Sequence, residues 1–244
     1  MIEFLEFVIS PEEKVVTGAV YTPKHIREYI VEQCYADVTD FKNLKICDPA
    51  CGCSGFLCTA AKLIKKNTDL TYREIFERNI FGLDIQEFSI TRSKLLLSLF
   101  AITEGEAADF SFNLHQGNAL IFNWSDVVRN YEGFDIILGN PPYVCSRNID
   151  KESRQFLLNW KVSNSGHPDL YIPFFQLGVE NLKPNGTLGY ITMNTFFKSV
   201  NGRAVRQYFY EEALALRILD FGSTQVFQSK STYTCICIIK KQKS

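Results

Sequence analysis

The residues Asn140-Pro141-Pro142-Tyr143 form a set that could carry chemistry. They follow the apolar run at residues 134–139, which has the composition of a buried strand. Because proline has no backbone N–H and a fixed φ, the chain must leave the sheet here. The Asn140 side-chain oxygen and the Pro141 carbonyl could accept both N–H bonds of an exocyclic amino group on a planar base. Tyr143 offers a ring on which that base could stack, although a packed tyrosine after a proline-terminated strand is the structural alternative.

The turn at residues 48–55 has the sequence Asp-Pro-Ala-Cys-Gly-Cys-Ser-Gly, and it lies where a strand passes into a helix. Its small residues would let a ligand approach the backbone amides. The spacing is neither that of a dinucleotide-binding glycine motif nor that of a P-loop. Since Asp48 would repel phosphate, the turn favours a cationic or hydroxyl-bearing ligand, or else it is only a tight structural turn.

Asp84 ends the next apolar run. A carboxylate at such a strand end can accept both hydroxyls of a ribose. The alternative is that Asp84 caps the following helix, and both roles can hold only if different carboxylate oxygens serve them.

Strand and helix patterns alternate along the chain, which predicts an α/β fold with an open, mostly parallel seven-stranded sheet, helices on both faces and a C-terminal antiparallel hairpin. In such a sheet, ligands bind beyond the carboxyl ends of the strands, so the turns there should converge. Strands are expected at residues 44–48, 79–84, 112–116, 134–140, 187–193, 216–222 and 232–241. Helices are expected at residues 21–34, 56–66, 87–102, 170–183 and 201–214.

The composition is that of a globular α/β domain, so residues 1–244 are interpreted as one domain. With a net charge of −1, any nucleic acid must be met by a local basic patch. The absence of a long apolar run or a basic leader predicts a cytoplasmic protein without a membrane partner. The eight cysteines have no zinc-site spacing, which predicts reduced thiols and no metal.

With these motifs in order, the chain resembles the S-adenosylmethionine-dependent adenine-N6 DNA methyltransferases of restriction–modification systems, in the gamma order of motifs. The stretches that carry the resemblance are GAVYTP, DPACGCSGFL, FGLDI, GNAL, NPPY, DLYIPFFQLGVENLKPNGTLGYIT and VFQSKSTYTCICII. The resemblance implies a Rossmann-like methyltransferase fold, S-adenosyl-L-methionine as cofactor, S-adenosyl-L-homocysteine as product, and double-stranded DNA with a flipped adenine as substrate.

The resemblance also assigns roles to individual residues. The catalytic set would be Asn140, Pro141, Pro142 and Tyr143. The cofactor-binding set would be Tyr21, Thr22, Asp48, Ala50, Gly52, Asp84, Ile85, Asn118 and Phe174. Within it, Asp48 would face the ammonium group and Asp84 the ribose, while Ile85 and Phe174 would clamp the cofactor adenine. Tyr143 and Phe227 would flank the target base, and Lys230 would touch that base or a phosphate.

Three features depart from the family pattern. Ser54 stands where glycine is usual, and its Cβ would crowd the ligand or require a positive φ. Asn118 replaces a common aspartate. The pattern also predicts a catalytic domain alone, with a cofactor-motif region at residues 1–36, a mobile lid-like substrate loop at residues 145–167, and target recognition supplied by another domain or subunit.

Two groups of cations near the expected pocket could contact DNA. They are Arg147, Lys151, Arg154 and Lys161, and Lys198, Arg203 and Arg206. His25 and His115 are interpreted as structural. Two other functions stay open: methylation of RNA or of a protein glutamine with the same acceptors, and a catalytically degenerate module that binds DNA or a partner. A nicotinamide dehydrogenase is disfavoured by the glycine spacing.

Overall fold

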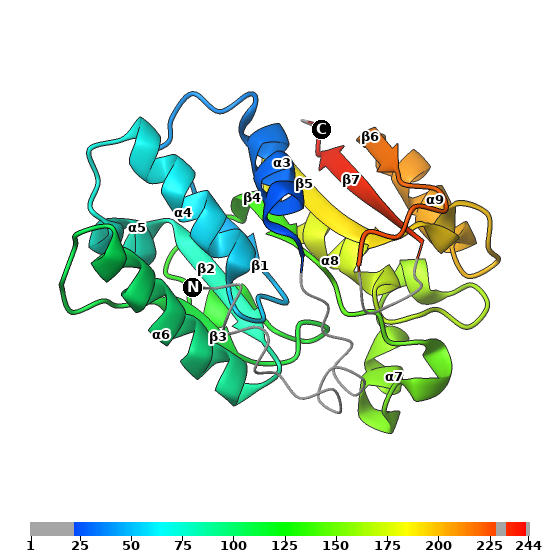
Figure 1. The fold of residues 1–244 in the computed structure, drawn as a ribbon. Coiled ribbons are helices and arrows are strands. Elements are labelled where there is room, and N and C mark those ends of the chain that lie inside the picture. Colours follow the sequence, from blue (N-terminus) through cyan, green and yellow to red (C-terminus); the bar gives the residue numbers. More distant parts are fainter. Residues whose placement is uncertain (1–21, 228–232, 243–244) are drawn as a thin grey trace.

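A computed structural model describes residues 22–227 and 233–242, and in them one seven-stranded sheet has the order β3-β2-β1-β4-β5-β7-β6 (Figure 1). The strands are β1 (Ile46–Asp48), β2 (Ile80–Asp84), β3 (Asn113–Gln116), β4 (Phe134–Gly139), β5 (Leu182–Met193), β6 (Ala215–Asp220) and β7 (Thr234–Lys240). The pairings from β3 to β5 are parallel, and β7 is antiparallel to both of its neighbours. The mostly parallel sheet with an antiparallel C-terminal pair confirms the predicted fold class.

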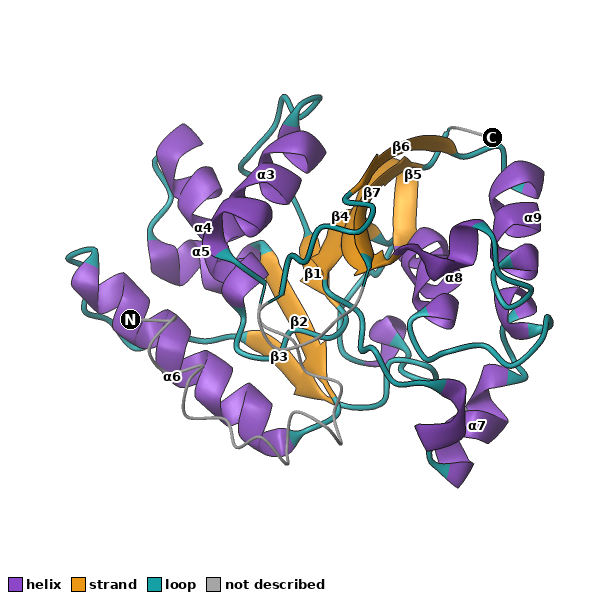
Figure 2. Cartoon of the chain, turned by 45° about the vertical axis from the view of Figure 1, so that its right-hand side comes forward, coloured by secondary structure: helices purple, strands orange, loops and turns teal. Residues whose placement is uncertain are grey.

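Helices cover both faces of the sheet (Figure 2). One face carries α3 (Lys24–Tyr35), α4 (Gly55–Asn67), α5 (Tyr72–Arg78) and α6 (Glu87–Thr103). The other carries α8 (Ile172–Asn181) and α9 (Arg203–Glu211). No helix in residues 22–227 and 233–242 has both the length and the apolar character that crossing a membrane would require.

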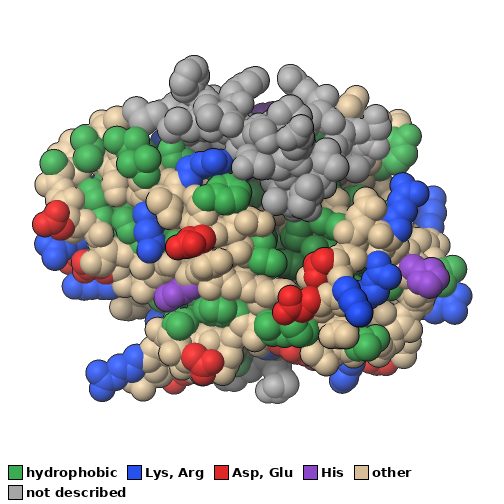
Figure 3. Space-filling view, turned by 90° about the horizontal axis from the view of Figure 1, so that it is seen from below, with side chains coloured by type: hydrophobic (Ala, Val, Ile, Leu, Met, Phe, Trp, Pro, Cys, Tyr) green, Lys and Arg blue, Asp and Glu red, His purple; other side chains and the backbone are tan. Residues whose placement is uncertain are grey.

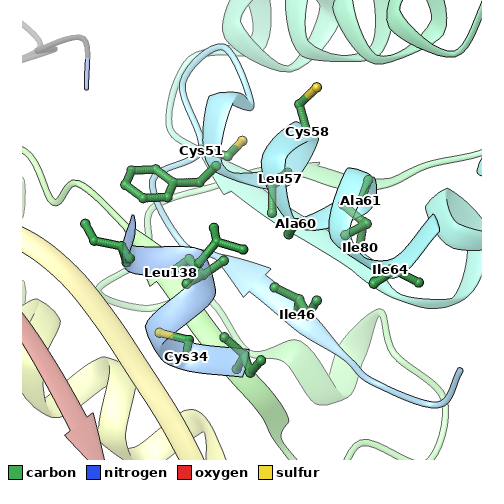
Figure 4. Packing of buried hydrophobic residues seen from close by; sticks show 14 of the residues in the cluster. Cys34, Ile46, Cys51, Leu57, Cys58, Ala60, Ala61, Ile64, Ile80 and Leu138 are labelled. Carbon is green, nitrogen blue, oxygen red and sulfur yellow. The ribbon is translucent and has the colours of Figure 1, made fainter. Parts of the chain in front are cut away.

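The first core lies between the sheet and the helices α3 and α4. Ile46 of β1 and Ile80 of β2 are at most 1% exposed, and they face the small side chains Ala60 and Ala61 of α4 (Figure 4). Small residues on a helix let it pack close to a sheet, so α4 is held tightly above β1 and β2. The turn at residues 48–55, which joins β1 to α4, is therefore fixed at both of its ends.

A turn interrupts the pairing of β5 with β4. The register passes from Phe134 opposite Leu182 to Ile136 opposite Thr187, and Asn185 has a φ of 64°. The Pro-Asn-Gly turn expected at residues 184–186 is thus a bulge within β5. Beyond the bulge the two strands remain parallel as far as Gly139, so β4 and β5 carry their carboxyl ends to the same edge.

Two helices were not expected from the sequence. Helix α5 begins with a capping box, in which the Thr71 side chain accepts from the Glu74 N–H while the Glu74 carboxylate accepts from the Thr71 N–H. Helix α7 (Lys151–Leu157) lies in the segment 145–167, which the sequence predicted to be a lid-like loop. This segment also contains two 3-10 turns. Its residues Ile149, Leu157 and Val162 are buried in the second core, which lies between the sheet and the helices α8 and α9. Its few apolar residues pack into the core, and Asp150 caps α7 by accepting from the Ser153 N–H.

Candidate active site

Asp48 ends β1 and is only 2% exposed. Its Oδ1 accepts a hydrogen bond from the Ala50 N–H at 3.0 Å. Burial raises the pKa of Asp48 from 3.8 to about 8, opposed by the Ala50 N–H and increased further by the charge of Asp84. At neutral pH this carboxyl is therefore mostly protonated, and it would ionise on pairing with a cation.

Asp84 ends the neighbouring strand β2, and both of its carboxylate oxygens bind backbone amides. Oδ2 accepts from the Gly52 N–H at 3.0 Å, and Oδ1 accepts from the Gln86 N–H at 2.9 Å. Burial raises its pKa, although these two amides oppose the shift. A hydrogen bond with the Ser89 side chain also opposes the rise in its pKa. Because a carboxylate can accept several hydrogen bonds, Asp84 can hold the turn after β1 and still accept from a ligand.

The turn that contains Asn118 is brought to the same edge by the pairing of β2 with β3. The Gly117 N–H donates to the Asp84 carbonyl at 2.9 Å, and the Asn118 Oδ1 accepts from the Leu120 N–H at 3.0 Å. The turns after β1, β2 and β3 are thus linked by hydrogen bonds, in line with the expected convergence.

Ser54 has a φ of 59° and a ψ of 27°, in the left-handed region, and it is fully buried. Of the two outcomes expected for a side chain here, the structure shows the positive φ. An L-residue in this conformation costs on the order of 1 kcal/mol relative to glycine. The strained residue directly precedes α4, on the turn that would hold the cofactor.

Gly139 brings the turn after β1 into contact with the Asn-Pro-Pro-Tyr motif. Its φ is 155°, and a Cβ built on it would lie 2.8 Å from the Asp48 Oδ1. The next residue, Asn140, donates from Nδ2 to the Thr22 Oγ1 at 3.1 Å. The absence of a side chain at Gly139 therefore lets a buried carboxyl lie directly beside the residue expected to bind the reacting amino group.

Tyr143 and Phe227 come together as expected, although they are far apart in sequence. Their ring centroids are 6.2 Å apart with an interplanar angle of 67°, an edge-to-face contact. Tyr143 is 8% exposed and Phe227 is 3% exposed. A base can therefore stack on one of these rings only if the other ring, or the residues that cover the pair, move away.

The remaining expected site residues differ in exposure. Ile85 is 54% exposed directly after Asp84, whereas Phe174 is buried in the second core. Ala50 and Gly52 are partly exposed on the turn after β1. Tyr21 and Lys230 lie outside the described residues.

Four of the seven cations that were expected to face DNA fall into two groups. Arg154 donates to the carbonyls of Ser146 and Ile149, and Arg206 donates to the carbonyl of Ser199, so both stabilise their own segments. Lys161 and Arg203 instead line one open hollow. In the view from below, basic and acidic side chains are interspersed over the described part of this one face (Figure 3).

The cysteines and histidines form no candidate metal centre. All eight cysteines are free, and within the described residues no group of three or more His, Cys, Asp or Glu side chains could hold a metal ion. His115 packs against Phe122 and Trp124, where burial lowers its pKa, and His25 is exposed on α3.

Sequence reasoning missed one link in the site. Thr22 was expected beside the cofactor, but its hydroxyl accepts from Asn140, 118 positions away. Arg27 was not singled out, yet it is 5% exposed and its Nη1 donates to the Thr22 carbonyl at 3.0 Å. The sequence did contain a signal for Arg27, because it is a basic residue within the apolar pattern of a helix.

The sequence model of the Eco57I restriction-modification methylase family matches residues 78–227, which is more than half of the chain. Among curated proteins, the chain is 28% identical to the type II restriction enzyme and methyltransferase RM.Eco57I of Escherichia coli, over 95% of this chain and 28% of that protein. It is also 28% identical to the type II methyltransferase M.BanIII of Aneurinibacillus aneurinilyticus, over 91% of this chain and 38% of that protein. The chain thus spans about a third of the length of these relatives.

Among solved structures, the type IIL restriction-modification enzyme MmeI in complex with DNA superposes with a TM-score of 0.73 at 15% identity, over all of this chain and 40% of that one. The fold is that of the class I S-adenosylmethionine-dependent methyltransferases. Because the family model matches more than half of the chain, the chain belongs to the Eco57I restriction-modification methylase family.

Proposed function

We propose that this chain is the methyl-transfer domain of a restriction–modification DNA methyltransferase and that it methylates the N6 amino group of adenine. The observation that carries this proposal is the position of Asn140, at the carboxyl end of β4 and one residue after the glycine that lies against the buried Asp48. An acceptor for an amino group and a carboxyl suited to a cation are thus adjacent, as methyl transfer between two bound molecules requires.

The residues on the first three strand ends fit S-adenosylmethionine. Asp48 is a buried carboxyl whose raised pKa signals that it lacks a counter-ion, and the ammonium group would supply one. The Asp84 carboxylate can accept further hydrogen bonds from ribose hydroxyls, and the exposed Ile85 side chain suits an adenine face. When bound, the cofactor would supply an electrophilic methyl group.

The substrate side would hold the target nitrogen by its own two protons. The Asn140 Oδ1 and the Pro141 carbonyl would accept from the amino group, which favours a tetrahedral nitrogen and stabilises the positive charge that develops as it attacks. One proton then leaves the methylated nitrogen for water. The pKa of Tyr143 is held well above its ordinary value of 10 by burial, so its ring would act as a neutral stacking surface.

A base inside a duplex cannot reach a buried acceptor, so the adenine would have to be flipped out. The open hollow lined by Lys161 and Arg203 could receive a backbone phosphate. With a net charge of only −1, the chain would depend on another domain or subunit for much of its affinity for DNA and for recognition of the target sequence. The greater length of the curated relatives supports this division.

The test is transfer of a labelled methyl group from S-adenosylmethionine to DNA, RNA and protein, assayed side by side. The labelled methyl group should be found in N6-methyladenine after the DNA is digested to nucleosides. Asn140→Ala should lower the rate by about 1,000-fold and leave cofactor binding within threefold. Label in N4-methylcytosine, RNA or glutamine would replace the substrate assignment, and absence of label with tight cofactor binding would favour a degenerate binding module.

A further inference from the structure

Thr22 and Arg27 lie behind Asn140, on the side where α3 begins. We infer that these two residues, called here the Asn140 anchor, are positioning residues that fix the side-chain amide of Asn140 so that its oxygen is the atom presented to the substrate. The inference rests on the proposed methyl transfer and adds to it the groups that set the geometry of the acceptor.

The first observation concerns the amide nitrogen. Asn140 Nδ2 donates to the Thr22 Oγ1 at 3.1 Å. Because the nitrogen and oxygen of an amide share one plane and are attached to the same carbon, fixing the nitrogen toward Thr22 also fixes the direction of the oxygen. A 180° rotation of the amide would present two N–H donors to an amino group, which would repel it rather than bind it.

The second observation explains why Thr22 stays in place. Its carbonyl accepts from the Arg27 Nη1 at 3.0 Å, and Thr22 and Arg27 are each only 5% exposed. A hydrogen bond from a charged donor inside the protein is stronger than one between neutral groups. The segment before α3 is thus tied to a side chain from the first turn of that helix.

The third observation joins the Asn140 anchor to the turn at residues 48–55. A Cβ built on Gly55, the first residue of α4, would lie 2.8 Å from the Arg27 Nη1. The guanidinium therefore packs directly against the end of the turn that would hold the cofactor. Arg27 consequently sets the distance between that turn and the residue that holds the acceptor.

This role differs from the cofactor contact that the family resemblance implies for Thr22. The Thr22 Oγ1 accepts a hydrogen bond from Asn140, and the Thr22 carbonyl accepts one from Arg27. Loss of the hydroxyl should therefore slow transfer rather than weaken cofactor binding. The two roles predict opposite changes in kcat and in cofactor Kd.

The experiment compares Thr22→Val with Thr22→Ser in two measurements. The first is NMR of asparagine-labelled protein without substrate, with the Asn140 side-chain signal identified by its loss in Asn140→Ala. In Thr22→Val the Asn140 NH₂ protons should exchange with water at least about 10-fold faster, and Thr22→Ser should restore slow exchange. The second is steady-state methyl transfer to DNA, where kcat should fall about 10- to 100-fold in Thr22→Val, with cofactor Kd within threefold.

Two further variants complete the comparison. Arg27→Lys keeps the charge and one donor, so its kcat should lie between those of the wild type and Thr22→Val. Thr68→Val is the matched control, because it removes a hydroxyl that donates to the Ile64 carbonyl and accepts from the Leu70 N–H at the other end of α4. It should change neither measurement.

Unchanged Asn140 exchange in Thr22→Val would overturn the inference whether or not the chain is active. Unchanged kcat with a cofactor Kd raised more than 10-fold would also overturn it and return Thr22 to a cofactor contact. If Thr22→Val speeds Asn140 exchange as expected but the wild-type chain methylates no DNA, the proposed function is rejected. The contact between Thr22 and Asn140 then still stands.

Discussion

At the carboxyl edge of the sheet, the turns after β1 and β2 are held by hydrogen bonds, whereas the turn after β4 combines the hydrogen bond of Asn140 with a pair of packed rings. In the first region, the N–H groups of Ala50, Gly52 and Gln86 bind the buried carboxyl of Asp48 and the partly buried carboxyl of Asp84. In the second region, Tyr143 packs edge to face on Phe227. Directional bonds fix atoms in place without a ligand, whereas ring contacts can be exchanged for others.

The difference predicts different behaviour on binding. The first region, which we propose binds the cofactor, should keep its geometry when the ligand enters. The second region, which we propose binds the base, must open, because both rings are almost fully buried. Substitutions in the two regions should therefore separate cofactor affinity from substrate affinity.

The largest effect is expected for Asp84→Asn. This change replaces one acceptor oxygen by an NH₂ group that faces backbone N–H donors, and it removes the charge offered to the ribose hydroxyls. Cofactor Kd measured by calorimetry should rise by about 100-fold. Asp109→Asn, at an exposed carboxylate, should leave Kd unchanged. A Kd within threefold of the wild type in Asp84→Asn would show that the first region does not bind the cofactor.

Phe227→Ala tests the second region. It removes one stacking ring, and a stacked base contributes on the order of 1–3 kcal/mol, so KM for DNA should rise at least about 10-fold. Cofactor Kd should stay within twofold, because the ring of Phe227 packs on Tyr143, in the second region. Phe110→Ala, which loses a ring pair with Phe76, is the control. A parallel loss of cofactor affinity would show that the two regions are coupled.

Asp48 should release a proton when the cofactor binds. With its pKa raised to about 8, the carboxyl is mostly protonated at pH 7, and pairing with an ammonium group would lower that pKa. Calorimetry at pH 7 in buffers of different ionisation enthalpy should detect close to one proton released per cofactor. Asp48→Asn should abolish the release, and equal release by both proteins would contradict the pairing.

The same carboxyl should affect stability without ligand. Its pKa in the folded state, about 8, lies above its ordinary value of 3.8, so its contribution is fully present below about pH 4 and is lost as pH rises toward 8. The free energy of unfolding of the wild type should therefore fall over this range relative to Asp48→Asn. Urea unfolding at pH 5 and pH 8 measures the difference.

The smallest effect is expected at Ser54. Ser54→Gly removes the Cβ from a residue with a φ of 59°, which should raise the free energy of unfolding by about 1 kcal/mol. Ser54→Ala keeps the Cβ and should give no such gain. Urea unfolding separates the two variants, and equal stability of both would show that the left-handed conformation costs little here.

Local sequence determined most of the strands and the points where they end. Gly139 followed by Asn140 and two prolines can only leave a sheet, and this was visible without any tertiary contact. The alternation of strands and helices similarly predicted a parallel sheet with convergent turns. These features depend on neighbours along the chain, which the sequence displays directly.

Two helical segments were missed because their structure depends on contacts between residues that are distant in sequence. Helix α7 has a polar composition, and its structure depends on Leu157 reaching the second core. Helix α5 is only seven residues long and is held partly by the Glu106 carboxylate, which accepts from the N–H groups of Tyr72 and Arg73. Short helices depend on such distant contacts, because their own propensity is insufficient.

The sequence alone thus determined which residue types lie at the carboxyl ends of the strands, since strand periodicity and chain-breaking residues act over a few positions. Only the tertiary structure decided how those residues are held. The burial that raises the pKa of Asp48, the contact of Gly139 with that carboxyl, and the bond from Asn140 to Thr22 all join residues from different elements. Such contacts follow from how the helices pack on the sheet, because packing brings distant residues together and removes water from between them.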